Sequence, residues 1–145
     1  MEAKFQGLVV EDRIGGTRGT VVEEAVEKNF AGETSEVGVY LAMARQAQRE
    51  GYPEIGEALI RIAWEEAWHA AGYAELAGRV STSTRENLER MLRGEAGANR
   101  GKREAALKAK EAGLDQAHAL LEISSRDEAR HARALEGLLK RYFPG

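Results

Sequence analysis

The chain has 145 residues, a formal net charge of −3, 43% hydrophobic residues and 6% aromatic residues. This length fits one domain, and the apolar content suffices for a core built largely from Ala and Leu, which suits packed helices. Both signs of charge are interspersed without a basic stripe, which argues against DNA or RNA as a partner. The absence of Cys excludes disulfides and every zinc or iron site bound through thiolates.

Residues 1–19 are predicted to be an irregular arm, because a short apolar run is followed by several glycines. Residues 20–145 are predicted to form one helical domain. Its first helix should begin at Thr20, which fits a capping box with Glu23, and should continue to Gly51.

A second helix is expected to begin at Pro53, since proline favours the first position of a helix, and to run to about Gly78. A polar break of Ser and Thr residues follows and offers N-caps, with Glu86 standing three residues after Ser83. The third helix is expected to continue from this break to about Ala112.

Gly113 closes the third helix, and a fourth is expected from about residue 115 to residue 142. No stretch alternates as a strand would, so the fold class is predicted to be all-α. No apolar run approaches the roughly 20 residues that a membrane span needs, and no signal peptide begins the chain. We therefore expect a soluble protein with a cytoplasmic location and no membrane partner.

Two copies of one pattern follow each other along the chain at a constant offset, without a gap. In each copy a lone Glu precedes a Glu-x-x-His unit by the same interval; the members are Glu33, Glu66 and His69, then Glu95, Glu128 and His131. This repeat predicts that each half is a helical hairpin. Because one hairpin cannot bury its apolar face alone, two hairpins must pack together as a four-helix bundle.

The repeated residues have the chemistry of a di-metal site. Positions three apart lie on one face of a helix, so each Glu-x-x-His unit can direct both side chains inward. Ferritin-like bundles bind two cations with one Glu from each of two helices and a Glu-x-x-His from each of the other two. Two divalent cations would offset the burial of four carboxylates, which otherwise costs several kcal/mol each. We therefore predict that the six repeated side chains are metal ligands.

Three residues near this face differ between the copies. Glu36 lies one turn after Glu33, and its repeat partner is Ala98, so Glu36 is a candidate fifth carboxylate. Tyr40 lies a further turn along and either hydrogen bonds a ligand carboxylate or is an ordinary core tyrosine. Lys102 replaces Tyr40 in the second copy, and its charge is expected to extend outward to solvent.

Other residues that invite a functional interpretation are expected to be structural. His118 lies about 140° around its helix from His131 and corresponds to Gly56, so it is predicted to lie on the surface. Trp64 and Trp68 are predicted to serve packing or an interface.

From about Phe30 to Phe143 the chain resembles the rubrerythrins of the ferritin-like superfamily. The resemblance rests on Asn29-Phe30-Ala31-Gly32-Glu33, Glu66-x-x-His69, Asn87-Leu88 before Gly94-Glu95, and Glu128-x-x-His131. It implies a ferritin-like bundle with two Fe ions per site and an oxidoreductase that reduces hydrogen peroxide to water. Manganese or zinc could occupy the same ligands. Alternatives are an oxidase or oxygenase that uses O2, and a ferroxidase or iron-binding protein without turnover.

The resemblance also implies partners and a ligand exchange. Many rubrerythrins carry a rubredoxin-like module with Cys ligands, which is missing here, so an external rubredoxin or flavin reductase would supply electrons. In that family one iron exchanges a His for an extra Glu that follows a ligand Glu by three residues. That position is Ala98 here, and the extra carboxylate is Glu36 instead. We therefore expect Glu36 and His131 to exchange, with Glu36 and Tyr40 as catalytic residues.

The connection between the second and third helices predicts a dimer. In the ferritin-like fold these helices run parallel, so the connector must return along the bundle. The return distance is about 30 Å, the sum of about 14 Å and about 17 Å of helix, whereas five or six residues span roughly 20 Å when fully extended. We therefore expect a swapped homodimer in which each bundle combines hairpins from both chains.

Overall fold

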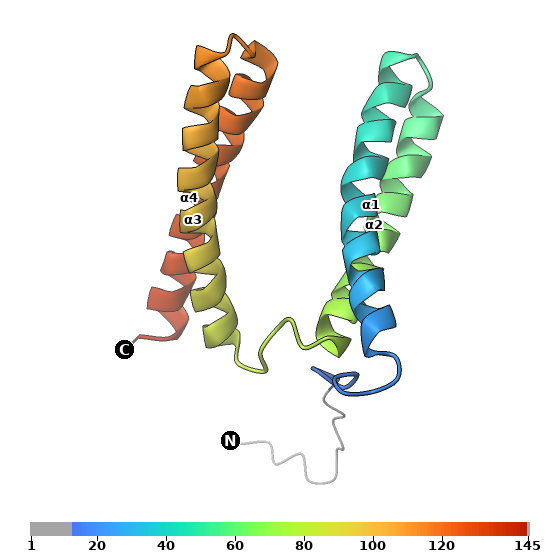
Figure 1. Cartoon of the computed structure of the whole chain (residues 1–145), viewed down its shortest axis with the longest axis vertical. Coiled ribbons are helices and arrows are strands. Elements are labelled where there is room, and N and C mark those ends of the chain that lie inside the picture. The colour runs from blue at the N-terminus through green and yellow to red at the C-terminus, as the bar shows by residue number, and fades with distance from the viewer. Residues whose placement is uncertain (1–12, 145) are drawn as a thin grey trace. The chain divides into compact units, whose positions relative to one another are not determined.

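The computed structural model describes residues 13–144, and this part of the chain is built from helices without strands (Figure 1). The four helices are α1 (Glu23–Arg49), α2 (Pro53–Leu76), α3 (Thr84–Glu111) and α4 (Asp115–Tyr142). This confirms the all-α class and is consistent with the ferritin-like four-helix bundle. Across these described residues, no helix has an apolar stretch that would carry it through a membrane.

The chain divides into two compact units, Met1–Val80 and Ser81–Gly145. In the first unit α1 packs against α2, and in the second α3 packs against α4 (Figure 1). The sequence repeat is therefore a repeat of helical hairpins, as predicted.

Small side chains form the seam within each hairpin. In the first hairpin the buried residues include Ala44, Ala47, Ala63 and Ala70, and in the second they include Ala106, Ala109 and Ser125. Gly56 brings α1 and α2 especially close, because a Cβ atom there would lie 3.3 Å from the carbonyl oxygen of Ala44. Small residues let two helices approach along their length and so bring the side chains beside the seam within reach of each other.

The start of α1 differs from the sequence prediction. The helix begins at Glu23, and the Thr20 hydroxyl donates a hydrogen bond to the carbonyl oxygen of Thr17 (2.7 Å) instead of capping a helix. Glu23 accepts a hydrogen bond from the backbone N–H of Gly19 (2.9 Å). The predicted cap at Thr20 was therefore wrong, because Thr20 belongs to the preceding turn.

The other predicted helix starts are confirmed. Pro53 is the first residue of α2. Ser83 caps α3 and accepts a hydrogen bond from the backbone N–H of Glu86 (3.3 Å). Asp115 begins α4 after Gly113, which has a positive φ of 71°.

The described end of the arm caps α2. Thr17 donates a hydrogen bond from its hydroxyl to the carbonyl oxygen of Leu76 (2.8 Å), and the Arg18 guanidinium donates to those of Ala77 (3.1 Å) and Gly78 (2.6 Å). The last carbonyls of a helix lack partners within it, and a positive side chain also complements the helix dipole there. The rest of the predicted arm, residues 1–12, lies outside the described residues, and the division at residue 19 stays a prediction.

Candidate metal centre

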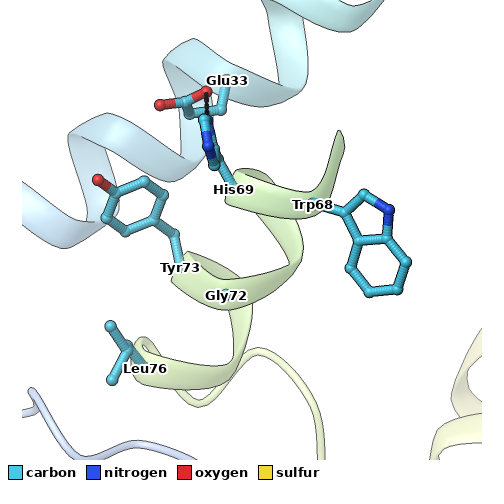
Figure 2. A pocket seen from close by; sticks show the side chains of 6 residues that line it. All are labelled: Glu33, Trp68, His69, Gly72, Tyr73 and Leu76. Atoms are coloured by element: carbon cyan, nitrogen blue, oxygen red, sulfur yellow. Dashed lines mark ion pairs between the residues drawn. The ribbon is translucent and has the colours of Figure 1, made fainter. Parts of the chain in front are cut away.

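Three predicted ligands meet in the first hairpin. Nδ1 of His69 on α2 lies 3.0 Å from Oε2 of Glu66 on the same helix and 3.4 Å from Oε2 of Glu33 on α1. Figure 2 shows the His69 ring directed across the seam at Glu33. The three-residue spacing places Glu66 and His69 on one face of α2, and packing against α1 supplies the third group. One ligand atom from each residue lies within 4.8 Å of the others.

The second hairpin repeats this arrangement. Nδ1 of His131 lies 3.4 Å from Oε2 of Glu95 and 3.4 Å from Oε2 of Glu128. Glu95 lies on α3, whereas Glu128 and His131 lie on α4. Their ligand atoms also fall within 4.8 Å of one another. All six residues that the sequence repeat selected therefore belong to two matching triads.

The carboxylates of both triads are sheltered, whereas the imidazoles remain accessible. The side chains of His69 and His131 are 59% and 50% exposed, whereas those of the four Glu residues are only 14% to 19% exposed. Oε2 of Glu33 and Oε2 of Glu95 are buried and accept no hydrogen bond from residues 13–144. A buried acceptor without a partner costs about 1–3 kcal/mol. In both hairpins the same oxygen of the same repeated Glu lies 3.4 Å from an imidazole Nδ1 but accepts no hydrogen bond from the described residues, so each triad has an acceptor whose burial a bound cation would offset.

Protons compete with a cation for the first triad. The pKa of Glu33 is raised, mainly by a hydrogen bond with the Glu66 carboxyl and further by burial. The same hydrogen bond lowers the pKa of Glu66. The pKa of His69 is raised, mainly by its hydrogen bond to Glu66. A cation binds the deprotonated forms of these groups, so metal binding at a pH near their pKa values should release protons to solvent.

Lys102 contacts the second triad, contrary to the prediction that its charge extends outward. Its Nζ forms an ion pair with Oε1 of Glu128. Lys102 lies two helical turns after Glu95 on α3, which places both on the same face. That spacing was visible in the sequence. The choice between solvent and Glu128 depends on the packing of α4 against α3.

The other candidates do not join the triads. Glu36 is exposed and Tyr40 is half-buried, and neither contributes to the clusters of ligand atoms found in the described residues. Their proposed roles stay predictions. His118 is half-buried instead of lying on the surface, because its Nδ1 lies 2.8 Å from the carbonyl oxygen of Ala106 and hydrogen bonds to it.

A hollow adjoins the first triad. Its volume is about 460 Å³, and its lining is shown in Figure 2: Glu33, Trp68, His69, Gly72, Tyr73 and Leu76. Gly72 leaves the hollow open, because a Cβ atom there would meet nothing within 4 Å. The exposed Trp68 side chain points away from Glu33 in this view. The hollow therefore lies directly against Glu33 and His69 of the first triad.

Comparison with known proteins adds evidence of kinship. A family model described as rubrerythrin matches residues 24–85. An uncharacterized protein of Methanocaldococcus jannaschii is 60% identical over 136 residues, which cover 94% of this chain and 96% of that protein. Reverse rubrerythrin-1 of Clostridium acetobutylicum is 49% identical over 141 residues, which cover 95% of this chain and 78% of that protein.

Proposed function

Because this chain belongs to the rubrerythrin family, we propose that it is a non-haem di-iron peroxidase that reduces hydrogen peroxide to water. The observation that carries the proposal is the pair of matching triads, each with a buried, unsatisfied Glu oxygen. Each triad would bind one cation. One α1–α2 hairpin and one α3–α4 hairpin together would therefore supply the ligands for a di-iron centre.

The ligand set suits iron. The two triads offer four carboxylates and two imidazoles, and four negative charges neutralise two divalent cations. Carboxylate and imidazole ligands without thiolate favour hard or borderline metals such as iron, and manganese or zinc are possible substitutes. When bound, two ferrous ions would supply the two electrons that convert one peroxide and two protons into two waters.

The chain's own residues would bind the metals and manage protons. A bound cation would hold Glu33 and Glu66 in their deprotonated forms. The half-buried Tyr40 would donate a hydrogen bond from its hydroxyl to a ligand carboxylate and fix its orientation. Electrons for the next cycle would come from an external rubredoxin or flavin reductase, since these 145 residues contain no Cys to bind a rubredoxin-like iron.

The extra carboxylate on α1 would give the site a redox-dependent ligand. Glu36 lies one turn from Glu33 and is exposed, so its side chain is not committed to another role in the packing of the hairpin. We include in the proposal that Glu36 replaces His131 on one iron as the oxidation state changes. Structures of the diferrous and diferric protein test this, and identical His131 ligation in both would contradict it.

The proposed assembly is a swapped homodimer. The helix stretches from His69 to the end of α2 and from the start of α3 to Glu95 measure about 10 Å and about 16 Å. Residues 77–83, which connect α2 to α3, could span this combined distance of about 26 Å only if every residue were extended. Gly78 has a positive φ of 68°, and the backbone N–H of Arg79 donates to the carbonyl oxygen of Ala74 (2.8 Å), so the connector begins with a turn instead. This turn shortens the reach of the connector and so supports the proposal that each bundle combines hairpins from two chains.

Analytical ultracentrifugation combined with metal analysis tests the assembly. We expect a dimer that binds four irons, two at each of its two centres. A monomer with two tightly bound irons would contradict the swap.

Stopped-flow reoxidation of the diferrous protein tests the proposed activity. We expect reoxidation by hydrogen peroxide to be much faster than reoxidation by O2. Faster reaction with O2 would identify an oxidase, and retention of far more than two irons per centre would identify a storage protein. Glu95→Gln should abolish the fast phase, whereas Glu104→Gln, an exposed change of the same kind on α3, should leave it unchanged.

A further inference from the structure

The two halves of the proposed centre have different neighbours at one repeated position. Lys102 on α3 forms an ion pair with Glu128, a member of the second triad. The same repeat position on α1 is Tyr40, which is neutral. At this position the first hairpin therefore offers a phenol where the second offers an ammonium.

A second difference adds negative charge to the first hairpin. The first hairpin carries Glu36 one turn after Glu33, whereas the second carries Ala98 one turn after Glu95. Across these matched positions and the triads, the first hairpin has three carboxylates and a neutral phenol. The second has two carboxylates and one ammonium.

We propose that Lys102 is a positioning residue that holds the Glu128 carboxylate while the second triad lacks metal, and that it makes the two triads take up cations in order, the first triad first. This inference rests on the proposed di-metal site. A cation that binds Glu128 must displace the ammonium or accept it as a near neighbour of like charge, whereas a cation at the first triad meets carboxylates and a neutral hydroxyl at the matched positions.

The geometry permits this exchange without a change of backbone. The Lys102 side chain is 35% exposed, so one edge of it already contacts solvent. The ammonium ends a flexible four-carbon stem and can swing away when a cation arrives. Before metal binds, the same ammonium compensates a carboxylate that is only 14% exposed, which would otherwise lie unpaired near the seam.

Titration with Co²⁺, whose visible absorption reports coordination, tests the order of loading. We expect the wild-type protein to bind in two distinguishable steps. Lys102→Met should strengthen the weaker step about 10-fold, which corresponds to about 1.4 kcal/mol of relieved repulsion between the ammonium and the cation. It should leave the stronger step unchanged. Lys108→Met, which removes an exposed charge from the same helix, is the matched control and should change neither step.

A reciprocal variant locates the effect. Tyr40→Lys places the ammonium beside the first triad and should weaken the stronger step. A second readout is thermal unfolding: Lys102→Met should lower the Tm of the metal-free protein and enlarge the rise in Tm on adding Co²⁺. If the Lys102→Met variant does not fold, Lys102→Tyr replaces it in both measurements, because tyrosine is the residue at the matched position of the first hairpin.

The outcomes separate this inference from the proposed function. If the wild-type protein binds no Co²⁺, the di-metal site itself is wrong and the inference fails with it. If two ions bind but Lys102→Met matches Lys108→Met, or weakens the second step, the di-metal site stands and the role of Lys102 is refuted.

Discussion

The two hairpins carry the same triad of candidate metal ligands beside different neighbouring residues. Both bring a Glu from one helix to a Glu-x-x-His on the other, with closely similar distances around the imidazole. Around that shared triad the first hairpin has Tyr40 and the second has Lys102, which contacts Glu128. The geometry of the triad is therefore nearly the same in both hairpins although the charge beside it differs.

The seams of the two hairpins also differ in polarity at matched positions. At the repeat positions where the first hairpin has Val37 and buried Ala63, the second has Asn99 and buried Ser125. Asn99 Nδ2 donates to the carbonyl oxygen (2.6 Å) and the hydroxyl (3.1 Å) of Ser125, and Ser125 Oγ donates to the carbonyl oxygen of Asn99 (3.0 Å). An apolar contact in one hairpin is therefore replaced by a satisfied polar network in the other.

The largest expected effect tests whether the triads are equivalent as ligands. Glu33→Gln and Glu95→Gln should each remove one bound cation per centre and slow reoxidation by peroxide by at least about 100-fold, because each removes a charged ligand instead of an outer neighbour. Metal analysis and stopped-flow absorbance measure the two effects. A variant that retains both cations would show that its triad is dispensable.

Metal removal should loosen both hairpins, since each has a buried oxygen whose burial a bound cation would offset. At a free Fe²⁺ concentration of about 100 times Kd, binding should stabilise the fold by about 2.7 kcal/mol per site. Anaerobic thermal unfolding with and without a chelator measures the change. An unchanged Tm would mean that cations bind no more tightly to the folded protein than to the unfolded chain.

A smaller effect is expected at the polar seam of the second hairpin. Asn99→Ala should lower the free energy of unfolding by about 1–3 kcal/mol, because it leaves the backbone carbonyl and hydroxyl of Ser125 with fewer partners. Replacing Asn99 by Val and Ser125 by Ala together, which copies the first hairpin, should cost less than the single change. Urea denaturation monitored by circular dichroism gives both values. If the double variant is less stable than Asn99→Ala, the hydrogen bonds that remain in Asn99→Ala contribute more to the free energy of unfolding than the apolar side chains that replace them.

The smallest expected effect is the pH response of the metal-free first triad. The pKa of His69 should lie above 6.5, because Glu66 and Glu33 favour its protonated form. Because the folded-state pKa is raised, the interaction makes its full contribution to stability at pH values below the unfolded-state pKa. That contribution is lost as the pH rises through the folded-state pKa. Imidazole resonances followed by NMR measure the value. In Glu66→Gln the pKa of His69 should fall, and a value that does not move would assign the shift to another group.

Much of the fold could be predicted because its signals are local. Pro53 and Ser83 mark helix starts through their own backbone and side-chain chemistry, and both were confirmed. Thr20 carried a similar signal but belongs to a turn that packs on the end of α2, through Thr17 and Arg18. Local capping chemistry predicts a helix start only where no competing turn offers the same groups another partner, as Thr17 does for Thr20.

The sequence by itself determined the six candidate ligands and the helices that carry them. A three-residue spacing on a helix has one geometric consequence, and the recurrence of the whole pattern at a constant offset in the second half excludes an accidental match. Only the tertiary structure decided that Lys102 contacts Glu128, that His118 contacts Ala106, and that one oxygen of each lone Glu is buried. These features depend on how closely two helices approach and which side chains fill the space between them, and helical periodicity carries no information about either.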